Sequence, residues 1–440
     1  MRHTRRQSNL DVKAPRLIVQ SCRGENSIPA FIAKKKMRPL SKLTELNRID
    51  RAVTHEIRIV PFMRTTRENL PMDAPMNTRS ASGPGTERKR VKIIRRKPDG
   101  RIDWRFWSQS FWTVICIWIG WEFYRFVAFH ESGAIGPAPS RPPGVESFLP
   151  ISGLMGLRDW FVNGVLNNIH PAATIILGLA ILSSVLLKKA FCGWVCPVGF
   201  ISEAVGTAGR KIHHWKGKLP RWIDWPLRSV KYLLLAFFVW AIFLQLSPQA
   251  LAAFIQSPYN KVADVKMLKF FTDIAPDSLW ILLGLVVLGA IVNGFWCRYL
   301  CPYGALAGLV SLVSPFKIRR TASACIDCNK CNLACPQHIP VMQLNQVRSD
   351  ECNACLMCID ACPSTQALDF SLPKSRAKLS RRALLMTVTG VFVIGIGIAQ
   401  WTGNWQNAIS QDEYRARIQD INNPVYTHNR GQAPAERPNR

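Results

Sequence analysis

Acidic residues are scarce in this chain of 440 residues, in which 28 Asp and Glu stand against 57 Lys and Arg and leave a formal net charge of +29. Residues 1–101 alone hold 25 basic and 9 acidic side chains. A basic arm of this kind is typical of nucleic-acid binding or of a cytoplasmic tail held near anionic lipid. Because an apolar segment follows at once, we interpret 1–103 as a disordered tail and predict no nucleic-acid partner.

The sequence also lacks the marks of a secreted or a nucleotide-binding protein. Its first 30 residues contain no apolar stretch, so no cleavable signal peptide is predicted. It has no glycine-rich nucleotide-binding fingerprint, so any flavin or nicotinamide chemistry is expected to belong to a partner. Solitary cysteines are few, because most of the 14 Cys recur in C-x2-C or C-x3-C spacings. Such spacings indicate metal ligation and argue against a disulfide-stapled domain.

What the sequence does contain is a set of apolar segments that a mean hydropathy of +0.04 conceals. Five of them approach the ~20 residues that a bilayer crossing needs. They are residues 107–129, 171–187, 232–254, 279–296 and 383–401. Tryptophans gather near their ends, as in an interfacial aromatic belt. The segments exclude a single soluble globule and predict membrane association.

The basic residues between these segments predict their orientation. Segments 130–170 and 255–278 carry two and three Lys and Arg, whereas 188–231 and 297–382 carry nine and eleven. The positive-inside rule therefore places the N-terminus and the two basic segments in the cytoplasm. We expect a multi-pass protein of the bacterial cytoplasmic (inner) membrane.

The strongest chemical signal is the run C-x2-C-x2-C-x3-C-P, which occurs twice, 27 residues apart. In this ferredoxin pattern three thiolates bind one [4Fe–4S] cluster and the fourth serves the other cluster. Cluster I is therefore assigned to Cys325, Cys328, Cys331 and Cys362. Cluster II is assigned to Cys352, Cys355, Cys358 and Cys335. A pair of structural zinc sites is the alternative, and two complete runs with both prolines disfavour it.

A second cysteine motif, C-x3-C-P, is duplicated after the second and fourth apolar segments. Its copies contain Cys192 and Cys196, and Cys297 and Cys301. If a helix continues through each motif, the two thiols lie one turn apart on one face. Brought together by pseudo-symmetry, the four thiols are candidates for an additional metal centre or for dithiol relays. Buried cysteines without metal are the third interpretation.

The combination of FCGWVCPVG and WCRYLCPYGA with two ferredoxin runs resembles the NapH/NosR-type membrane polyferredoxins over residues 104–372. These include the iron–sulfur subunit of a quinol dehydrogenase serving periplasmic nitrate reductase and the maturation protein of nitrous-oxide reductase. The resemblance implies transfer of electrons between the quinone pool and another redox protein, such as a periplasmic cytochrome or reductase. No external segment matches the large flavin domain of the maturation proteins, which favours a plain electron-transfer subunit.

The expected fold is a mainly α-helical integral membrane protein with a small α+β ferredoxin domain. A four-helix core with duplicated C-x3-C-P hairpins spans 104–318, and the 2[4Fe–4S] ferredoxin domain spans 319–372. Residues 373–440 supply a fifth span and an external tail. The pair Arg381-Arg382 at the start of this span is either a twin-arginine export motif or a pair of positive-inside anchors.

Few ionisable residues fall within the apolar segments. Glu122 is a candidate proton acceptor for quinol, and the alternative is an ion pair with Arg125 three residues later. His130 and His170 flank an external loop without matching partners on another span, which disfavours haem. The predicted function is membrane electron transfer, in a redox subunit rather than a stand-alone enzyme. An assembly or redox-sensing factor that handles metal or thiols is the alternative.

Overall fold

The longest helix, α2, runs over Trp104–Glu131 and begins at an Asp103 cap whose carboxylate accepts the N–H groups of Arg105 and Phe106. In this computed structural model the described residues are 103–134, 136–214, 219–373 and 377–426. All of them belong to one compact unit of the chain, Thr65–Arg440. The predicted basic tail therefore lies outside the described residues, apart from Asp103.

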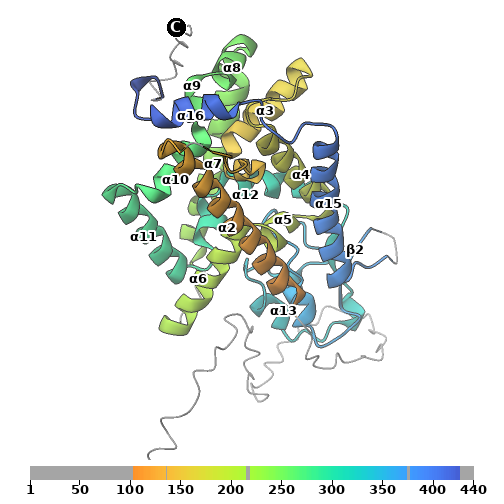
Figure 1. The fold of residues 1–440 in the computed structure, drawn as a ribbon. Helices are drawn as coiled ribbons and strands as arrows, with labels where there is room; N and C mark the ends of the chain where they lie inside the picture. The colour runs from red at the N-terminus through yellow and green to blue at the C-terminus, as the bar shows by residue number, and fades with distance from the viewer. Residues whose placement is uncertain (1–102, 135, 215–218, 374–376, 427–440) are drawn as a thin grey trace, which may run out of the picture. The chain divides into compact units, whose positions relative to one another are not determined.

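The helices up to the second C-x3-C-P motif form the larger part of this unit (Figure 1). In chain order they are η1 (Pro143–Phe148), α3 (Pro150–Asn163), α4 (Pro171–Leu187), α5 (Ala190–Trp194), α6 (Pro197–His213), α7 (Arg221–Val239), the π-helix η2 (Trp240–Gln245), α8 (Pro248–Ile255), α9 (Pro258–Lys261), α10 (Ala263–Thr272), α11 (Pro276–Ile291) and the π-helix η3 (Trp296–Leu300). Many begin with proline, whose missing N–H costs nothing in the first helical turn.

The remaining elements complete the core, the ferredoxin domain and the C-terminal helices. They are α12 (Pro302–Val310), η4 (Ser311–Val313), β1 (Lys317–Arg320), η5 (Ala322–Ala324), α13 (Lys330–Leu333), η6 (Val341–Gln343), α14 (Met357–Asp360), β2 (Leu368–Ser371), α15 (Arg381–Trp401), α16 (Gln411–Gln419) and η7 (Pro424–Tyr426).

Two described helices are long and apolar enough to cross a membrane, Arg221–Gln245 and Arg381–Trp401. A third candidate exists if α10 and α11, which meet at 79°, count as one broken span. Segment 171–187 forms α4, a shorter apolar helix. The predicted four-helix core is thus observed only in part, whereas the fifth predicted segment, 383–401, lies within a candidate span.

The predicted segment 232–254 is wrong in its boundaries. The helix that contains it starts at Arg221 and ends at Gln245, and a new helix starts at Pro248. The side chain of Ser247 accepts the N–H of Ala250 and caps this second helix. A proline cannot continue the preceding helix but suits the first turn of the next one, so the apolar run is divided here.

The ferredoxin domain is built on a single antiparallel strand pair. In this pair β1 faces β2, with Lys317 opposite Ser371 and Arg320 opposite Leu368. The short helices α13 and α14 follow the second cysteine of each run, and Arg105 of α2 donates to the Met357 sulfur of α14 at 3.7 Å. Apolar side chains of this domain pack in one cluster with Leu187 and Trp194 of the helical part and with Leu384 of α15.

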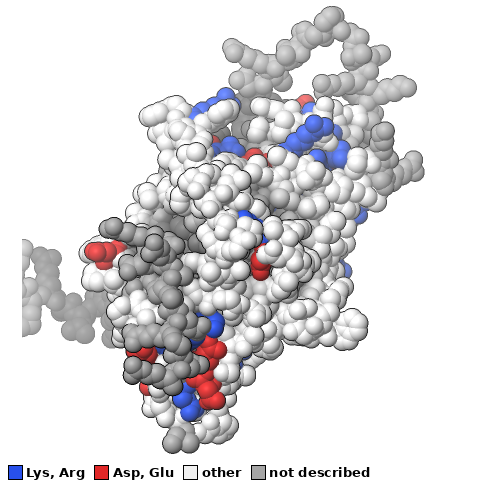
Figure 2. Space-filling model, turned by 90° about the horizontal axis from the view of Figure 1, so that it is seen from above, with Lys and Arg blue, Asp and Glu red and all other residues white. Residues whose placement is uncertain are grey.

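The opposite end of the unit carries α8, α9 and α16, at the top of Figure 1. A second apolar cluster joins them to α2 through Phe126, Leu251 and Ile418. Viewed from this end, the surface is mostly uncharged, and its Lys, Arg, Asp and Glu side chains are confined to a few patches (Figure 2). The ferredoxin cysteine runs therefore lie at one end of the unit and this apolar cluster at the other.

Candidate functional site

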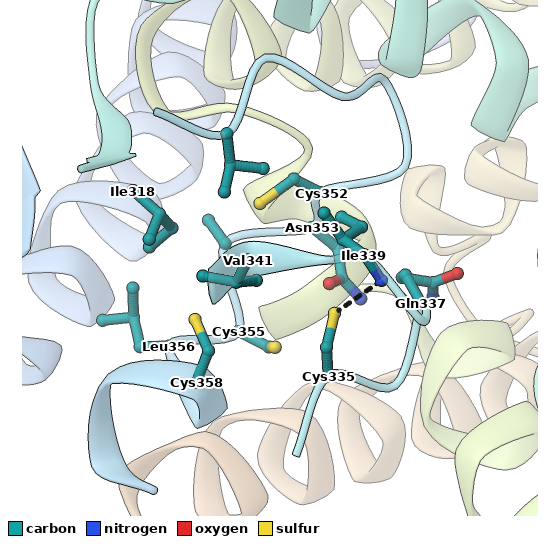
Figure 3. A pocket seen from close by; sticks show the side chains of 12 residues that line it. Ile318, Cys335, Gln337, Ile339, Val341, Cys352, Asn353, Cys355, Leu356 and Cys358 are labelled. Carbon is teal, nitrogen blue, oxygen red and sulfur yellow. Dashed lines mark hydrogen bonds between the residues drawn. The ribbon is translucent and has the colours of Figure 1, made fainter. Parts of the chain in front are cut away.

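Four cysteines surround a cavity in the ferredoxin domain, which we call the Cys352 cavity (Figure 3). Three come from the second run and one from the first: Cys352, Cys355, Cys358 and Cys335. Apolar side chains, including Ile318 and Val341, line much of the remainder, and the space not filled by protein atoms is about 340 Å³. The structure thus brings together the set predicted for cluster II, across the two runs.

A second cavity, the Cys325 cavity, has the complementary composition. It is lined by Cys325, Cys328, Cys331 and Cys362, the set predicted for cluster I, around about 310 Å³ of unfilled space. Cys328 is exposed and Cys325 half-buried, whereas the four cysteines of the Cys352 cavity are buried. The Cys325 cavity is therefore the more exposed of the two to solvent.

The backbone of both runs is wound in the same unusual way. Asp327 and Asn329 flank the second cysteine of the first run with φ of 51° and 60°. Ala354 and Leu356 flank that of the second run with φ of 49° and 61°. Non-glycine residues adopt such conformations at a cost of ~1–3 kcal/mol each, and they concentrate at functional sites. Turns of this kind form the backbone concavities that bind anions and Fe–S centres, so the residues present fit thiolate-ligated clusters.

Within the Cys352 cavity, burial disfavours the free thiolate. It raises the pKa of Cys355 to about 12 and that of Cys358 well above the usual value. Metal ligation requires thiolates, so iron has to displace these protons. Among the residues that the structure describes, no three Cys, His, Asp or Glu side chains converge on one point as ligands of a single ion do. The sulfurs are instead spread around the cavity (Figure 3).

The loop of the Cys352 cavity lies directly against the first C-x3-C-P motif. The indole of Trp194 donates to the carbonyl oxygen of Ala354 at 3.0 Å. A Cβ added at Gly193 would lie only 2.4 Å from the carbonyl oxygen of Asn353. The Arg105 guanidinium of α2 donates to the carbonyl oxygen of Gly193 at 2.9 Å. Glycine is thus needed at 193 because the two backbones approach so closely.

Each C-x3-C-P motif ends one helical segment and begins the next. Cys196 and Cys301 are the N-cap residues of α6 and α12, which start at Pro197 and Pro302. The Cys301 sulfur accepts the N–H of Gly304 at 3.2 Å. The condition that one helix continues through each motif is therefore not met, and the proline of each motif starts a new helix instead. A proline at that position has no N–H to donate and is accommodated as the first residue of a new helix.

The two motifs meet in space. The rings of Phe191 and Tyr303, one from each copy, have centroids 5.7 Å apart. The thiols interact electrostatically across the motifs, Cys192 with Cys301 and Cys196 with Cys297. Burial raises the pKa of Cys192 to about 11 and that of Cys297 to about 12. The duplication thus gathers four half-buried thiols at one place.

Three lysines, predicted only as orientation signals, are buried between the helices and the ferredoxin domain. Lys231 of α7 lies 2.5 Å from a carboxylate oxygen of Glu351, and Lys189 lies 3.7 Å from the other. Lys188 donates to the carbonyl oxygen of Ser349 at 3.0 Å. Burial alone would raise the pKa of Glu351, but Lys189 and Lys231 hold it below its usual value. Sequence reasoning missed this network, although Glu351 directly precedes Cys352.

Glu122 lines neither cysteine cavity. Its carboxylate accepts from Arg125 at 3.2 Å, the geometry of the alternative interpretation. The two arginines before the last apolar segment also have partners inside the fold. Arg381 forms ion pairs with Asp360 and, at 3.9 Å, with Asp103, and Arg382 lies 5.1 Å from the centroid of the Trp104 ring.

A buried polar cluster at the opposite end was also missed by sequence reasoning. Arg141 lies 2.9 Å from a Glu146 oxygen and 2.7 Å from an Asp264 oxygen. Tyr414 of α16 donates to Asp264 at 3.2 Å. The ring of His170, one of the two histidines considered for haem, has Nε2 2.7 Å from the carbonyl oxygen of Asn260. Segments far apart in the chain contribute these residues, so no local pattern indicates the cluster.

Two family profiles match the chain. One, described as a 4Fe-4S binding domain, matches residues 169–216 and 274–321, which carry the two C-x3-C-P motifs. The other, described as a 4Fe-4S dicluster domain, matches residues 317–363, which carry both ferredoxin runs.

The curated relatives include redox proteins. YccM of Escherichia coli, named for electron transport, is 43% identical over 348 residues, which are 76% of this chain and 97% of YccM. The ferredoxin-type protein NapH of Haemophilus influenzae is 27% identical over 205 residues, 44% of this chain and 67% of NapH. The regulatory protein NosR of Pseudomonas aeruginosa is 28% identical over 176 residues, 39% of this chain and 23% of NosR. No solved structure gives a significant match.

Proposed function

Because the chain belongs to the NapH/NosR-type family of iron–sulfur electron-transport proteins, together with YccM, we propose that it is a quinol-linked electron-transfer subunit integral to the bacterial inner membrane. The observation that supports electron transfer is the pair of cysteine cavities. Each is lined by the four cysteines that one [4Fe–4S] cluster needs. No chemistry beyond electron transfer is assigned to the chain, so substrate conversion belongs to a partner.

The two cavities are proposed to hold one [4Fe–4S] cluster each. Cys325, Cys328, Cys331 and Cys362 ligate cluster I, and Cys352, Cys355, Cys358 and Cys335 ligate cluster II. When bound, such a cluster takes up or releases one electron at a time without making or breaking substrate bonds. The protein's part is to exclude water from the Cys352 cavity and to fix both sets of thiolates in position.

The environments of the cavities support an order of transfer. The Cys325 cavity includes the exposed Cys328, so cluster I exchanges electrons with the soluble side. The Cys352 cavity touches the C-x3-C-P region through Asn353 and Ala354, so cluster II exchanges electrons with the membrane part. Electrons therefore pass between cluster I near the surface and cluster II in the core, in either direction.

The proposed orientation places the ferredoxin domain and the N-terminus in the cytoplasm. The basic segments 188–231 and 297–382 support it through the positive-inside rule. The proposed partners are the quinone pool and an external redox protein such as a cytochrome or reductase, and not nucleic acid. Glu122 stays a prediction as proton acceptor for quinol, since its pairing with Arg125 accounts for the side chain equally well.

The test is quinol-dependent reduction of the clusters in anaerobic membranes that contain the full chain. We expect a short-chain quinol to produce the EPR signals of reduced [4Fe–4S] clusters, and membranes from cells lacking the protein to show none. Clusters that dithionite reduces but that no quinol reduces would refute the quinol link while leaving the iron–sulfur assignment intact. The Glu122→Gln variant, measured beside Arg125→Gln, tests whether Glu122 contributes to the quinol rate.

A second candidate function is a metal- or thiol-handling assembly or redox-sensing factor. It is supported by the regulatory designation of the NosR relative and by the four gathered C-x3-C-P thiols. It predicts that loss of this protein leaves an enzyme of the respiratory chain without its metal. An enzyme that keeps its metal but loses its electron supply would instead support the electron-transfer function.

A further inference from the structure

The C-terminal end of α4 is covered by the turn that leads into the ferredoxin domain. The Ser314 hydroxyl in this turn donates to the carbonyl oxygen of Leu186 at 2.9 Å and accepts the N–H of Lys188 at 3.0 Å. Three apolar side chains remain exposed around it, since Leu186 is 38% exposed and Leu312 and Val313 of η4 are 45% and 74% exposed. The turn is thus fixed at the point where an apolar helix ends, beside apolar side chains that the fold leaves uncovered.

Three basic side chains gather directly after this turn, and we call them the β1 basic cluster. Lys317 and Arg319 belong to β1, and the exposed Arg348 belongs to the loop whose backbone bonds to β1. The Lys317 ammonium donates to the carbonyl oxygen of Leu312 at 3.1 Å, which joins the cluster to the apolar turn. Burial lowers the pKa of Lys317, and the positive charges of Arg348 and Arg319 lower it further. Lys317 is therefore close enough to both arginines to be repelled by them.

The hydrogen bonds of this cluster hold its side chains in place without balancing their charge. Arg319 donates to the side-chain oxygen of Gln346 at 2.7 Å and to the carbonyl oxygen of Ser371 at 3.3 Å. These acceptors are neutral, as is the carbonyl oxygen that Lys317 uses. An external anion is therefore able to compensate the cluster. Guanidinium groups suit phosphate because their N–H fork matches its oxygens.

We propose that the β1 basic cluster binds the phosphate of an anionic phospholipid whose acyl chains pack on Leu186, Leu312 and Val313. The proposal rests on the membrane integration in the proposed function, but not on the quinol link. Exposed apolar side chains beside cations are the arrangement with which proteins bind the boundary between acyl chains and anionic headgroups. A free phosphate would use the cations and leave the apolar side chains uncovered. Because β1 pairs with β2, a lipid bound here would hold the ferredoxin domain at the membrane surface.

The test is lipid binding by the full-length protein in detergent, measured by native mass spectrometry. Phosphatidylglycerol should bind more tightly than phosphatidylcholine of the same chain length. Arg348→Gln should weaken the binding of phosphatidylglycerol about five-fold, as expected for one cation near an anionic surface, and leave that of phosphatidylcholine unchanged. The matched control Lys330→Gln removes an exposed positive charge of α13 in the same domain and should change neither affinity. Equal binding of the two lipids, or equal effects of the two substitutions, would overturn the proposal.

Val313→Ser gives an independent readout of the apolar half of the site. It should weaken the binding of both lipids, because contacts with acyl chains do not depend on the headgroup, and unchanged binding would refute the packing on η4. Displacement of phosphatidylglycerol by an equal concentration of inorganic phosphate would assign the cluster to free phosphate instead. Binding of an acidic flavodoxin that Arg348→Gln abolishes, without any preference between the lipids, would assign it to a protein partner.

The outcomes for the lipid site and for the proposed function are distinguishable. A preference for phosphatidylglycerol in a protein whose clusters no quinol reduces would refute the quinol link and support the lipid site. A full-length chain that stays soluble without detergent would refute the membrane integration and the lipid site together.

Discussion

At Gly193 the backbones of the helical part and the ferredoxin domain approach each other closely. Its Cα faces the carbonyl oxygen of Asn353, and the neighbouring Trp194 is fully buried with its indole bonded to Ala354. The Lys231–Glu351 pair lies at the same junction. The contacts of Gly193, Trp194 and Lys231 therefore fix the position of the Cys352 cavity against the first C-x3-C-P motif.

Gly193→Ala should destabilise the protein by about 1–3 kcal/mol. The new methyl group would clash with the backbone carbonyl oxygen of Asn353, which is unable to move aside as a flexible side chain does. Differential scanning calorimetry in detergent measures the effect. Gly178→Ala is the matched control, since a Cβ there has no neighbour within 4 Å. In the helix α4 this control should be neutral or stabilise by up to ~1 kcal/mol. Equal effects of the two substitutions would contradict the predicted close approach.

Glu351→Gln should destabilise the protein by about 3–5 kcal/mol at neutral pH, because Lys189 and Lys231 are left without their buried carboxylate. The pKa of Glu351 is held below its unfolded value, so its contribution is full above about pH 4.3 and is lost as the pH falls through the lower, folded pKa. The difference between variant and wild type should therefore shrink only under acid conditions.

The measurement is the unfolding midpoint of both proteins between neutral and acid pH. Asp369→Asn is the control, because its partner Lys378 is 57% exposed and such surface pairs contribute at most ~1 kcal/mol. A Glu351→Gln effect as small as that of the control would show that the buried lysines are compensated by something other than Glu351.

At the scale of elements, the positions of the motif cysteines are set by where helices begin. The starts of α6 and α12 place Cys196 and Cys301, and the loops before α13 and α14 wrap the cysteine cavities. At the far end, short helices and loops are joined through Arg141, which ties η1 to α10 and, through Asp264, to α16. That end therefore depends on one guanidinium that neutralises two buried carboxylates.

Arg141→Met should destabilise the protein by about 3–5 kcal/mol, because Glu146 and Asp264 remain buried without their counter-ion. Limited proteolysis is expected to cut near α16, whose Tyr414 depends on the same cluster. Arg125→Met is the control, since the Arg125 side chain is 52% exposed and pairs with Glu122 three residues earlier. A stable Arg141→Met protein with α16 still protected would refute this role.

At the scale of the whole molecule, the proposed electron transfer has to connect the end that carries the cysteine cavities with the end that carries α8, α9 and α16. The cysteine cavities lie at one end, with the first C-x3-C-P motif beside the Cys352 cavity. A hydrocarbon core is ~30 Å thick. Under the proposed function, quinol diffusion, a further cofactor or a partner subunit therefore completes the crossing.

The crossed ligation of the two clusters is testable on the intact chain. Cys328→Ser/Cys335→Ser changes two cysteines of one run but one ligand of each cluster, so about eight irons should be lost. Cys335→Ser/Cys352→Ser changes one cysteine of each run but two ligands of a single cluster, so about four should be lost. Iron analysis and EPR spin counting distinguish the variants. The reverse pattern would show that each run ligates its own cluster.

Local patterns in the sequence predicted the cysteine sets, the fifth apolar helix and the family. These features depend on spacing along the chain, since a C-x2-C-x2-C loop folds around its own ligands and a long apolar run stays helical. The helix boundary at Pro248 was not predicted, because the apolar residues continue through it without a break. A capping serine and a proline nevertheless end one helix and start the next at this point.

Only the tertiary structure decided which charges meet. Lys189 and Lys231 are separated from Glu351 by more than a hundred residues, and Arg141 is equally remote from Asp264. The sequence shows that carboxylates are scarce, with 28 Asp and Glu against 57 Lys and Arg. It does not show that Glu351 is buried among three lysines. Burial makes an ammonium group expensive without a counter-ion, and burial is a property of packing between distant segments.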